Sequence, residues 1–470
     1  MSTLNPFEDL TNITFADCKL DREKYADVLT DIVRTNPNGF VLAIDNKWGT
    51  GKTTFVNMWR NKLMEKDEFK TLYFNAWEND FENNPFVAIT AELKELLGRE
   101  SSETFKAVLD KGSKIAKAAL PSILKNLVKR HGGEGLAEIL EKTSEGILAS
   151  FEDDIKDYIE RKANIKDFHK KLEEYIAENS NDKPIVFIID ELDRCRPNYA
   201  VSVLENIKHL FSVKGIVFVL SIDKVQLGYA IRGVYGSDRM DSDEYLRRFI
   251  DVEYSLPPPE LDEYIIYLLE LFKMEEFFSL EPRKESVLSG ETKSFIIFTK
   301  FLFKLRSLTL RQQEKIIRHV GVTIKSFGSS SFIIPELLVY LIYLRLFHGD
   351  FYIKIKKREL NHENLLANIE ITLQGTLNVR NENYLRVNIE ALMVLFYNEY
   401  LDHDDKNKLN SLSKFSAENE LGVKSKFDYN QNQSLFIDYI SEEKNNFRRR
   451  RTSIDYLLNK IDLMEPFKDL

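Results

Sequence analysis

The sequence predicts an α/β fold with a parallel sheet, followed by a region that is almost wholly helical. Short apolar runs of the kind that is buried in parallel sheets alternate with helical patterns in the first part of the chain. Three consecutive prolines at 257–259 end this alternation, because three prolines cannot continue a helix or a central strand. The 470 residues include only 19 glycines and 12 prolines, so tight turns should be few.

The elements of the α/β part follow from these patterns. Apolar spacing predicts helices over residues 21–33 and 53–63. Residues 85–182 are helical in pattern, with breaks at Pro121 and at Gly132-Gly133, and we interpret them as an insertion between two strands. The short apolar runs predict five strands, at 40–44, 70–75, 185–189, 216–222 and 252–256.

After the prolines the chain shows helical patterns without a repeat. Residues 261–274 and 307–320 are amphipathic. The most apolar stretch, 332–347, is interrupted by Glu336 and Arg345, whereas a membrane-spanning helix needs about 20 apolar residues. We therefore expect a buried core helix there and no transmembrane segment.

Composition excludes several classes of protein. With 66 basic and 75 acidic residues the net charge is −9, which argues against a protein whose whole surface coats nucleic acid. A local basic run at 448–451 leaves nucleic-acid contact open, although a solvated helix start or an interface with an acidic partner explains it more simply. Cys18 and Cys195 alone make neither a disulfide framework nor a zinc site, and no signal peptide is visible, so we expect a cytoplasmic protein.

A glycine-containing loop joins the first predicted strand to the second predicted helix. Its sequence over residues 46–53, NKWGTGKT, matches the Walker A pattern GxxxxGK[ST] except at the first position. Gly49 and Gly51 allow the backbone to curl so that its N–H groups point at phosphate oxygens. Lys52 would reach the β- and γ-phosphates, and the Thr53 hydroxyl would ligate Mg²⁺.

The departure from the pattern is Asn46, which stands where Walker A has glycine. Because asparagine tolerates left-handed backbone angles better than most residues, we expect the loop to keep its shape. The predicted nucleotide-binding set is Asn46, Lys47, Trp48, Gly49, Thr50, Gly51, Lys52, Thr53 and Thr54.

The third predicted strand ends in acidic residues, which is the Walker B arrangement. Asp190 would hold Mg²⁺ through its water shell, as the acid at this strand end does in P-loop proteins. Glu191 is placed to orient or deprotonate an attacking water. For Asp193 and Arg194, a local ion pair is as good an explanation as a role in catalysis.

Together these segments resemble the KAP family of P-loop NTPases. The likeness covers about residues 20–330, and only the combination of its pieces is specific. The loop at 47–53 is similar to the family's WGxGK[ST], and Glu191 keeps a carboxylate where the family often has aspartate. The other matching segments are FNAW at 74–77, NP at 84–85, DELDRCRP at 190–197, LENIK at 204–208, VFVLSID at 217–223, EYL at 244–246 and LP at 256–257.

The resemblance implies a domain organisation and a chemistry. We expect an NTPase core over 1–258 with a helical insertion at about 85–182, a helical lid over 259–325 and a C-terminal helical domain over 326–470. The implied activity is Mg²⁺-dependent ATP hydrolysis. Two alternatives stay open: a nucleotide-gated switch with slow turnover, and a scaffold whose ATP is structural. Some relatives carry transmembrane helices inside the nucleotide domain, but here Lys117 and Lys125 make the insertion too charged.

Weaker candidates come from the same resemblance. Asp223 would either sense the γ-phosphate or simply cap a strand end. Arg248, on a helix over 244–249, would either act as an arginine finger or remain a surface charge. Arg311 would be a lid sensor or, more simply, a charge at a helix start, and we expect Trp77 in the core. A finger at Arg248 implies a homo-oligomer. The family also suggests a bacterial anti-phage or plasmid-exclusion role beside a partner effector protein.

Overall fold

The computed structural model describes residues 12–463 except for ten gaps. These lie at 66–68, 96–102, 116–143, 181–182, 285–287, 376–381, 403–404, 410–421, 430–432 and 451–452. The chain forms two compact units, one spanning residues 4–258 and the other containing residues 259–470. The predicted breaks at Pro121 and at Gly132-Gly133 lie outside the described residues.

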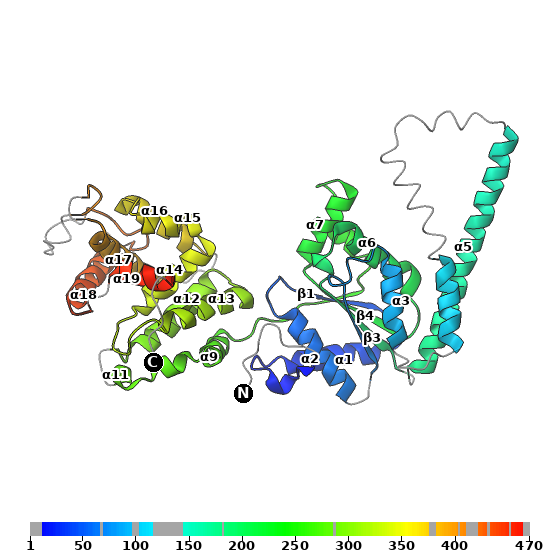
Figure 1. Cartoon of the computed structure of the whole chain (residues 1–470), viewed down its shortest axis with the longest axis horizontal. Coiled ribbons are helices and arrows are strands. Elements are labelled where there is room, and N and C mark those ends of the chain that lie inside the picture. Colours follow the sequence, from blue (N-terminus) through cyan, green and yellow to red (C-terminus); the bar gives the residue numbers. More distant parts are fainter. Residues whose placement is uncertain are drawn as a thin grey trace. The chain divides into compact units, whose positions relative to one another are not determined.

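The first unit is built on a five-stranded sheet in which all neighbouring strands are parallel (Figure 1). The strand order is β2-β3-β4-β1-β5, so β4 lies between β1 and β3. This confirms the predicted fold class. The strands are β1 (Val41–Asp45), β2 (Thr71–Asn75), β3 (Ile185–Asp190), β4 (Ile216–Ile222) and β5 (Val252–Tyr254), each within two residues of its predicted bounds.

Two separate hydrophobic clusters cover the two faces of this sheet. Alternate residues of β4 point to opposite faces, so that Phe218 and Leu220 belong to one cluster, and Val217 and Val219 to the other. The first cluster includes side chains of α3 (Pro85–Glu95), α6 (Pro197–Asn206), α7 (Lys224–Tyr235) and the C-terminal part of α5 (Ser144–Asn179). The second includes side chains of α1 (Glu23–Thr35) and α2 (Lys52–Glu65). The sheet is therefore sandwiched between helices, as expected for a parallel sheet.

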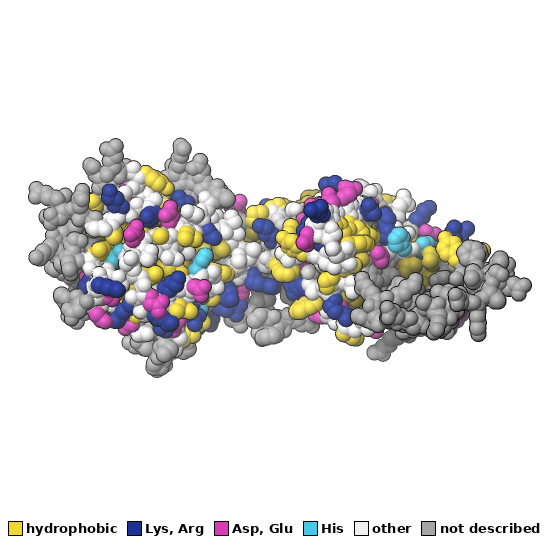
Figure 2. Space-filling model, turned by 90° about the horizontal axis from the view of Figure 1, so that it is seen from above, with side chains coloured by type: hydrophobic (Ala, Val, Ile, Leu, Met, Phe, Trp, Pro, Cys, Tyr) yellow, Lys and Arg dark blue, Asp and Glu magenta, His cyan; other side chains and the backbone are white. Residues whose placement is uncertain are grey.

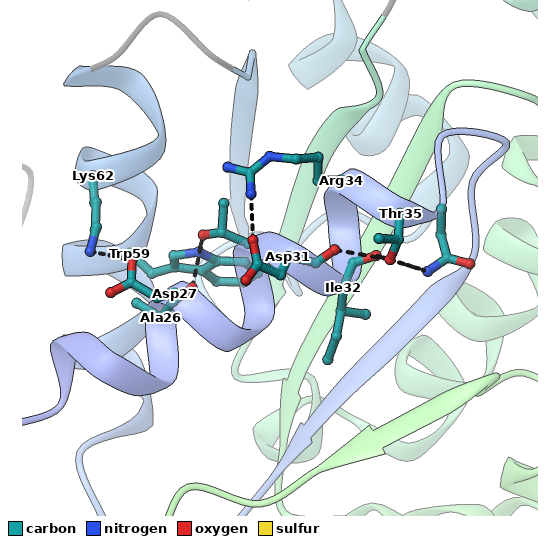
Figure 3. A network of polar contacts seen from close by, with 10 residues as sticks. Ala26, Asp27, Asp31, Ile32, Arg34, Thr35, Trp59 and Lys62 are labelled. Carbon is teal, nitrogen blue, oxygen red and sulfur yellow. Dashed lines mark hydrogen bonds and ion pairs between the residues drawn. The ribbon is translucent and has the colours of Figure 1, made fainter.

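Helix α2, which follows the Walker A loop, is fixed on α1 by polar contacts (Figure 3). The buried indole of Trp59 donates to the Thr30 hydroxyl at 3.0 Å. Lys62 pairs with Asp27 at 2.5 Å, while Arg34 and Asp31 form an exposed ion pair one turn further along α1. The contacts of Trp59 and Lys62 hold the helix whose N-terminus ends the loop, whereas the Asp31–Arg34 pair lies within α1.

The helical insertion and several short elements complete this unit. The predicted insertion contains α3, a helix over residues 103–115 and α5. The predicted helix over 244–249 is shorter, because α8 covers Ser242–Leu246 and residues 247–249 form a turn. The remaining elements are η2 (Phe15–Asp17), η4 (Leu192–Arg194) and the π-helical η5 (Ile207–Phe211).

In its described residues the second unit consists of helices joined by turns and loops. Its centre is α14 (Pro335–Phe347), whose side chains from Leu337 to Leu344 are buried, which confirms the predicted core helix. In the described part of the chain no helix is long and apolar enough to cross a membrane. The division of this unit into a lid and a C-terminal domain stays a prediction. Its other helices are α9 (Leu261–Leu271), α10 (Met274–Phe278), α11 (Glu281–Lys284), α12 (Glu291–Leu305), α13 (Leu310–Ile324), α15 (Gly349–Lys356), α16 (His362–Leu373), α17 (Asn383–Tyr400), α18 (Ser434–Arg450) and α19 (Ile454–Ile461).

Candidate functional site

The candidate site lies where β1, β3 and β4 end. Because these strands are parallel, their carboxyl ends meet at one edge of the sheet, which is where ligands bind in open α/β folds. Asp190 on β3 is in register with Ser221 on β4, and Ser221 is in register with Ile44 on β1. Segments separated by the long helical insertion are thereby brought side by side.

The loop between β1 and α2 has the curled backbone that phosphate binding requires. Gly49 and Gly51 have φ values of 79° and 82°, which residues with a Cβ rarely adopt. The ammonium of Lys52 folds back over the loop and donates to the carbonyl of Asn46 and, at 3.3 Å, to that of Lys47. Backbone N–H groups, a helix N-terminus and a lysine thus converge at one place.

Asn46 keeps the loop in place in a way that the sequence did not predict. Its backbone is not left-handed, so conformational tolerance is the wrong explanation for asparagine at this position. Instead its side-chain amide donates to the carbonyl of Leu256 at 2.9 Å and accepts from the N–H of Leu256 at 2.8 Å. The start of the loop is thereby tied to the chain that follows β5.

The Lys52 ammonium is almost fully buried and lies in the field of several carboxylates. Burial lowers the pKa of Lys52, whereas the charges of Asp193, Asp223, Asp190 and Asp45 raise it. Asp45 and Asp190 are the last residues of β1 and β3, and Asp223 directly follows β4. Asp193 lies in the turn after β3. The site therefore combines one buried cation with several anions, an arrangement suited to a polyanion that arrives with a metal cation.

Asp190 is buried, and both of its oxygens have hydrogen-bond donors. One accepts from the N–H of Glu191 at 2.9 Å and the other from the Tyr73 hydroxyl at 3.1 Å. Burial, and then the charge of Asp190, raise the pKa of Tyr73, which keeps this phenol protonated as a donor. The hydroxyl of Ser221 beside Asp190 is buried and has no hydrogen-bond partner among the described residues. Tyr73 and Ser221 gave no signal in the sequence, because only strand register brings them to Asp190.

Glu191 has an unusual backbone and a paired side chain. Its φ of 60° is left-handed, a conformation that is rare outside glycine and tends to occur at functional sites. Its Oε1 pairs with Arg194 at 2.5 Å and its Oε2 accepts from Asn75 at 3.4 Å. Burial raises the pKa of Glu191, while the positive charge of Arg194 opposes that rise. Glu191, the predicted base, therefore lies at the site with both carboxylate oxygens in contact with other side chains.

Asp193 joins the two loops of the site. It is buried and accepts from the indole Nε1 of Trp48, while the backbone N–H of Trp48 donates to Asp223 at 3.1 Å. Burial raises the pKa of Asp193. The predicted local ion pair is present for Arg194, whose partner is Glu191, whereas Asp193 bonds to Trp48.

Three other predicted residues have different surroundings. Asp223 caps α7 by accepting from the Gln226 N–H at 3.2 Å, and it also accepts from the backbone N–H of Trp48 in the loop. The same residue therefore caps the helix and lies at the site. Trp77 is not in the core: it is 53% exposed, in the turn after β2, and lies over the Arg194 guanidinium at 5.5 Å. Arg311 is exposed in the first turn of α13.

Arg248 is exposed in the turn after α8. Three residues later, Asp251 exchanges hydrogen bonds with Val41 at the amino end of β1, the opposite end of that strand from the loop. A five-residue strand is about 17 Å long, beyond the reach of an arginine side chain. Glu253, an acid close to Arg248 in the sequence, pairs with Lys224 at 2.7 Å. The side chains of the basic run at 448–451 lie outside the described residues.

These residues fit a magnesium nucleotide. The loop N–H groups and Lys52 suit phosphate oxygens, while the Thr53 hydroxyl and Asp190 are the oxygen ligands that Mg²⁺ uses beside phosphates and water. The unpartnered Ser221 hydroxyl at the same edge leaves a buried polar atom that a bound water or metal ligand would satisfy.

We expect Asn46→Gly, which restores the standard Walker A glycine, to destabilise the protein. The buried N–H and C=O groups of Leu256 would lose their partners, at a cost of about 1 to 3 kcal/mol in unfolding free energy. Urea-induced unfolding measures this. The matched control is Asn38→Gly in the exposed turn before β1, where the change should be within about 0.5 kcal/mol. Equal stability of Asn46→Gly and wild type would show that the Leu256 contacts are dispensable.

Comparisons with known proteins place this site in a family. The family described as "KAP family P-loop domain" matches residues 22–347. A search of curated proteins gives no match. Among solved structures, the ORC2 protein of Aeropyrum pernix in its ADPNP–ADP complexes is 14% identical, with 79% of this chain and 75% of that chain covered and a TM-score of 0.27. The A. pernix ORC1 protein in complex with DNA is 13% identical, with 84% and 82% covered and a TM-score of 0.34, and at such scores neither likeness carries an argument. Because the family match spans more than two thirds of the chain and includes every strand end that forms the site, the chain belongs to the KAP family of P-loop NTPases.

Proposed function

We propose that this protein binds ATP with Mg²⁺ and hydrolyses it to ADP and phosphate. The observation that carries the proposal is the convergence of Lys52, Asp190 and Glu191 at one sheet edge, although a long helical insertion separates them in the chain. ATP rather than GTP is proposed because the family resemblance favours it and the sequence has no evident NKxD motif for reading guanine.

Each residue has a distinct part in this chemistry. Lys52 and the loop N–H groups would bind the β- and γ-phosphates, and Thr53 and Asp190 would hold Mg²⁺, which when bound offsets phosphate charge. Glu191 would take a proton from water while the water oxygen bonds to the γ-phosphorus and the bond to ADP breaks. Asp223, through its contact with Trp48, would couple the loop to α7.

Hydrolysis and binding should separate by mutation. We expect Glu191→Gln to lower kcat by about 10² to 10⁴ while ATP still binds, because only the base is lost. Lys52→Ala and Asp190→Ala should instead weaken nucleotide binding. Steady-state phosphate release and equilibrium binding of a fluorescent ATP analogue measure the two effects. Glu160→Gln on the exposed part of α5 is the control. Unimpaired turnover in Glu191→Gln would assign the base to another residue, with Asp193 first in line.

A slow nucleotide-gated switch is the second candidate function. The 2.5 Å ion pair between Glu191 and Arg194 favours it, since a paired carboxylate is a poor base. The number of turnovers per bound nucleotide, measured in the same assay, distinguishes an enzyme that cycles from a switch that hydrolyses about once.

We further propose that the active form is a homo-oligomer in which Arg248 serves the ATP site of a neighbouring subunit. Because Arg248 lies at the far end of β1 from its own loop, it has no phosphate to meet within the same chain. Hydrophobic side chains gather on the α6–α7 side of this unit (Figure 2), and Val225, Tyr229 and Tyr235 of α7 are at least half exposed. Such a patch favours a protein interface.

A shared site predicts that Arg248→Ala and Lys52→Ala, each impaired alone, regain part of the activity when mixed, since a mixed interface can contain one intact site. Supplying an arginine finger can be worth about 10³ to 10⁵ in rate. Specific activity should also rise with protein concentration. Absence of rescue, together with activity that does not depend on concentration, would leave Arg248 as a surface charge.

At the level of the cell, we propose a role in bacterial defence against phage or plasmids beside a partner effector protein. The support is the family resemblance and a sequence without a nuclease or protease motif of its own. Deleting the gene from its native strain should raise phage plating or plasmid uptake. No change across a broad panel of phages and plasmids would contradict this role.

A further inference from the structure

The turn after β3 places Arg194 against Glu191, the predicted base. Glu191 is left-handed and begins the 3-10 turn of η4, and the N–H of Arg194 donates to the carbonyl of Glu191 at 3.1 Å. This single turn places the Arg194 guanidinium 2.5 Å from Glu191 Oε1. The side chains of Glu191 and Arg194 are only 11% and 26% exposed, so water screens their pairing less than that of a surface ion pair.

The second carboxylate oxygen of Glu191 is engaged as well. Its Oε2 accepts from the Asn75 amide at 3.4 Å. Asn75 is itself oriented, because its Oδ1 accepts from the N–H groups of Trp77 and Glu78 at 3.1 and 3.2 Å. Both oxygens of the predicted base are therefore held by side chains of two strand ends.

Arg194 is held on its other side by Trp77. The indole ring lies 5.5 Å from the guanidinium carbon, within the range of a cation–π contact. The segment that carries Trp77 is anchored by Asp80, whose carboxylate accepts from Arg196 at 2.8 Å and from the Arg196 backbone N–H at 2.7 Å. The exposed Trp77 therefore has a defined position from which to orient Arg194.

We propose that Arg194, oriented by Trp77, is a positioning residue that restrains Glu191 and slows ATP hydrolysis. A carboxylate bound to a guanidinium is held in place and stabilised as an anion, so it accepts a proton from water less readily. This inference rests on the proposed function, since it assumes that Glu191 is the base. It adds a residue that lowers turnover without contributing to nucleotide binding.

The first experiment compares Arg194→Gln with wild type in steady-state hydrolysis. We expect kcat to rise about fivefold and ATP affinity to stay unchanged. Arg194→Lys, which keeps the charge but not the planar fork, should lie between the two. The matched control is Arg34→Gln, which removes an arginine that also pairs with an acid three residues away, on α1 (Figure 3). Trp77→Ala should raise kcat less than Arg194→Gln does, and Trp77→Phe should behave like wild type.

A second readout needs no nucleotide. Because the Arg194 guanidinium lies 5.5 Å from the Trp77 ring and is paired with Glu191, the emission of Trp77, obtained in each protein by subtracting the spectrum of its Trp77→Phe counterpart, should differ from wild type in Arg194→Gln and in Glu191→Gln. An identical Trp77 spectrum in wild type and both variants would overturn the link between the three side chains.

The outcomes separate the two proposals. Equal or lower kcat in Arg194→Gln, with an active wild type, overturns the restraint and leaves the ATPase function standing. Hydrolysis by Arg194→Gln when wild type is almost inactive supports the restraint strongly. If neither protein hydrolyses ATP although both bind it, the proposed hydrolysis fails, and the restraint fails with it.

Discussion

The buried ammonium of Lys52 is the constraint around which the nucleotide unit is organised. Burial favours loss of its proton, and a cluster of carboxylates, foremost Asp193 and Asp223, opposes that loss. These acids follow different strands, so they reach Lys52 only if β4 lies between β1 and β3 and all three strands run in the same direction. The strand order therefore brings the Lys52 ammonium and the carboxylates that balance its charge to one edge of the sheet. The two helical layers and the long insertion leave this arrangement intact.

The phosphate loop has the backbone angles of its pattern although its motif is incomplete. Only Gly49 and Gly51 have the positive φ that demands glycine. At Asn46 the backbone is ordinary, and the side chain supplies two hydrogen bonds to Leu256 that a glycine could not make. A departure from the pattern therefore coincides with an additional anchor between the loop and the chain after β5.

Sequence reasoning predicted local features well and long-range contacts poorly. The apolar runs located the five strands of the described residues; β1, β3 and β4 are buried along almost their whole length, which requires continuous apolar sequence. The Walker motifs located Lys52, Asp190 and Glu191. No pattern, however, indicated that Tyr73 reaches Asp190, or that Trp48 reaches Asp193, since both contacts depend on which strand ends become neighbours. The prediction for Trp77 failed because aromatic character favours burial on average, whereas this residue follows the strand end and lies on a guanidinium.

The pairing of Arg194 with Glu191 has a consequence for how such a site can be controlled. Both residues belong to one short turn, so the pair can form or break by side-chain rotation, without movement of the phosphate loop or the sheet. Lys52 and Asp190 would then keep their geometry while only the base changes its state. Trp77, which lies on the outer side of this turn and is half exposed, is the element of the group that a neighbouring molecule could contact first. A P-loop protein built in this way can hold nucleotide with its binding residues in place, because the readiness of the base is governed by contacts separate from those that bind phosphate.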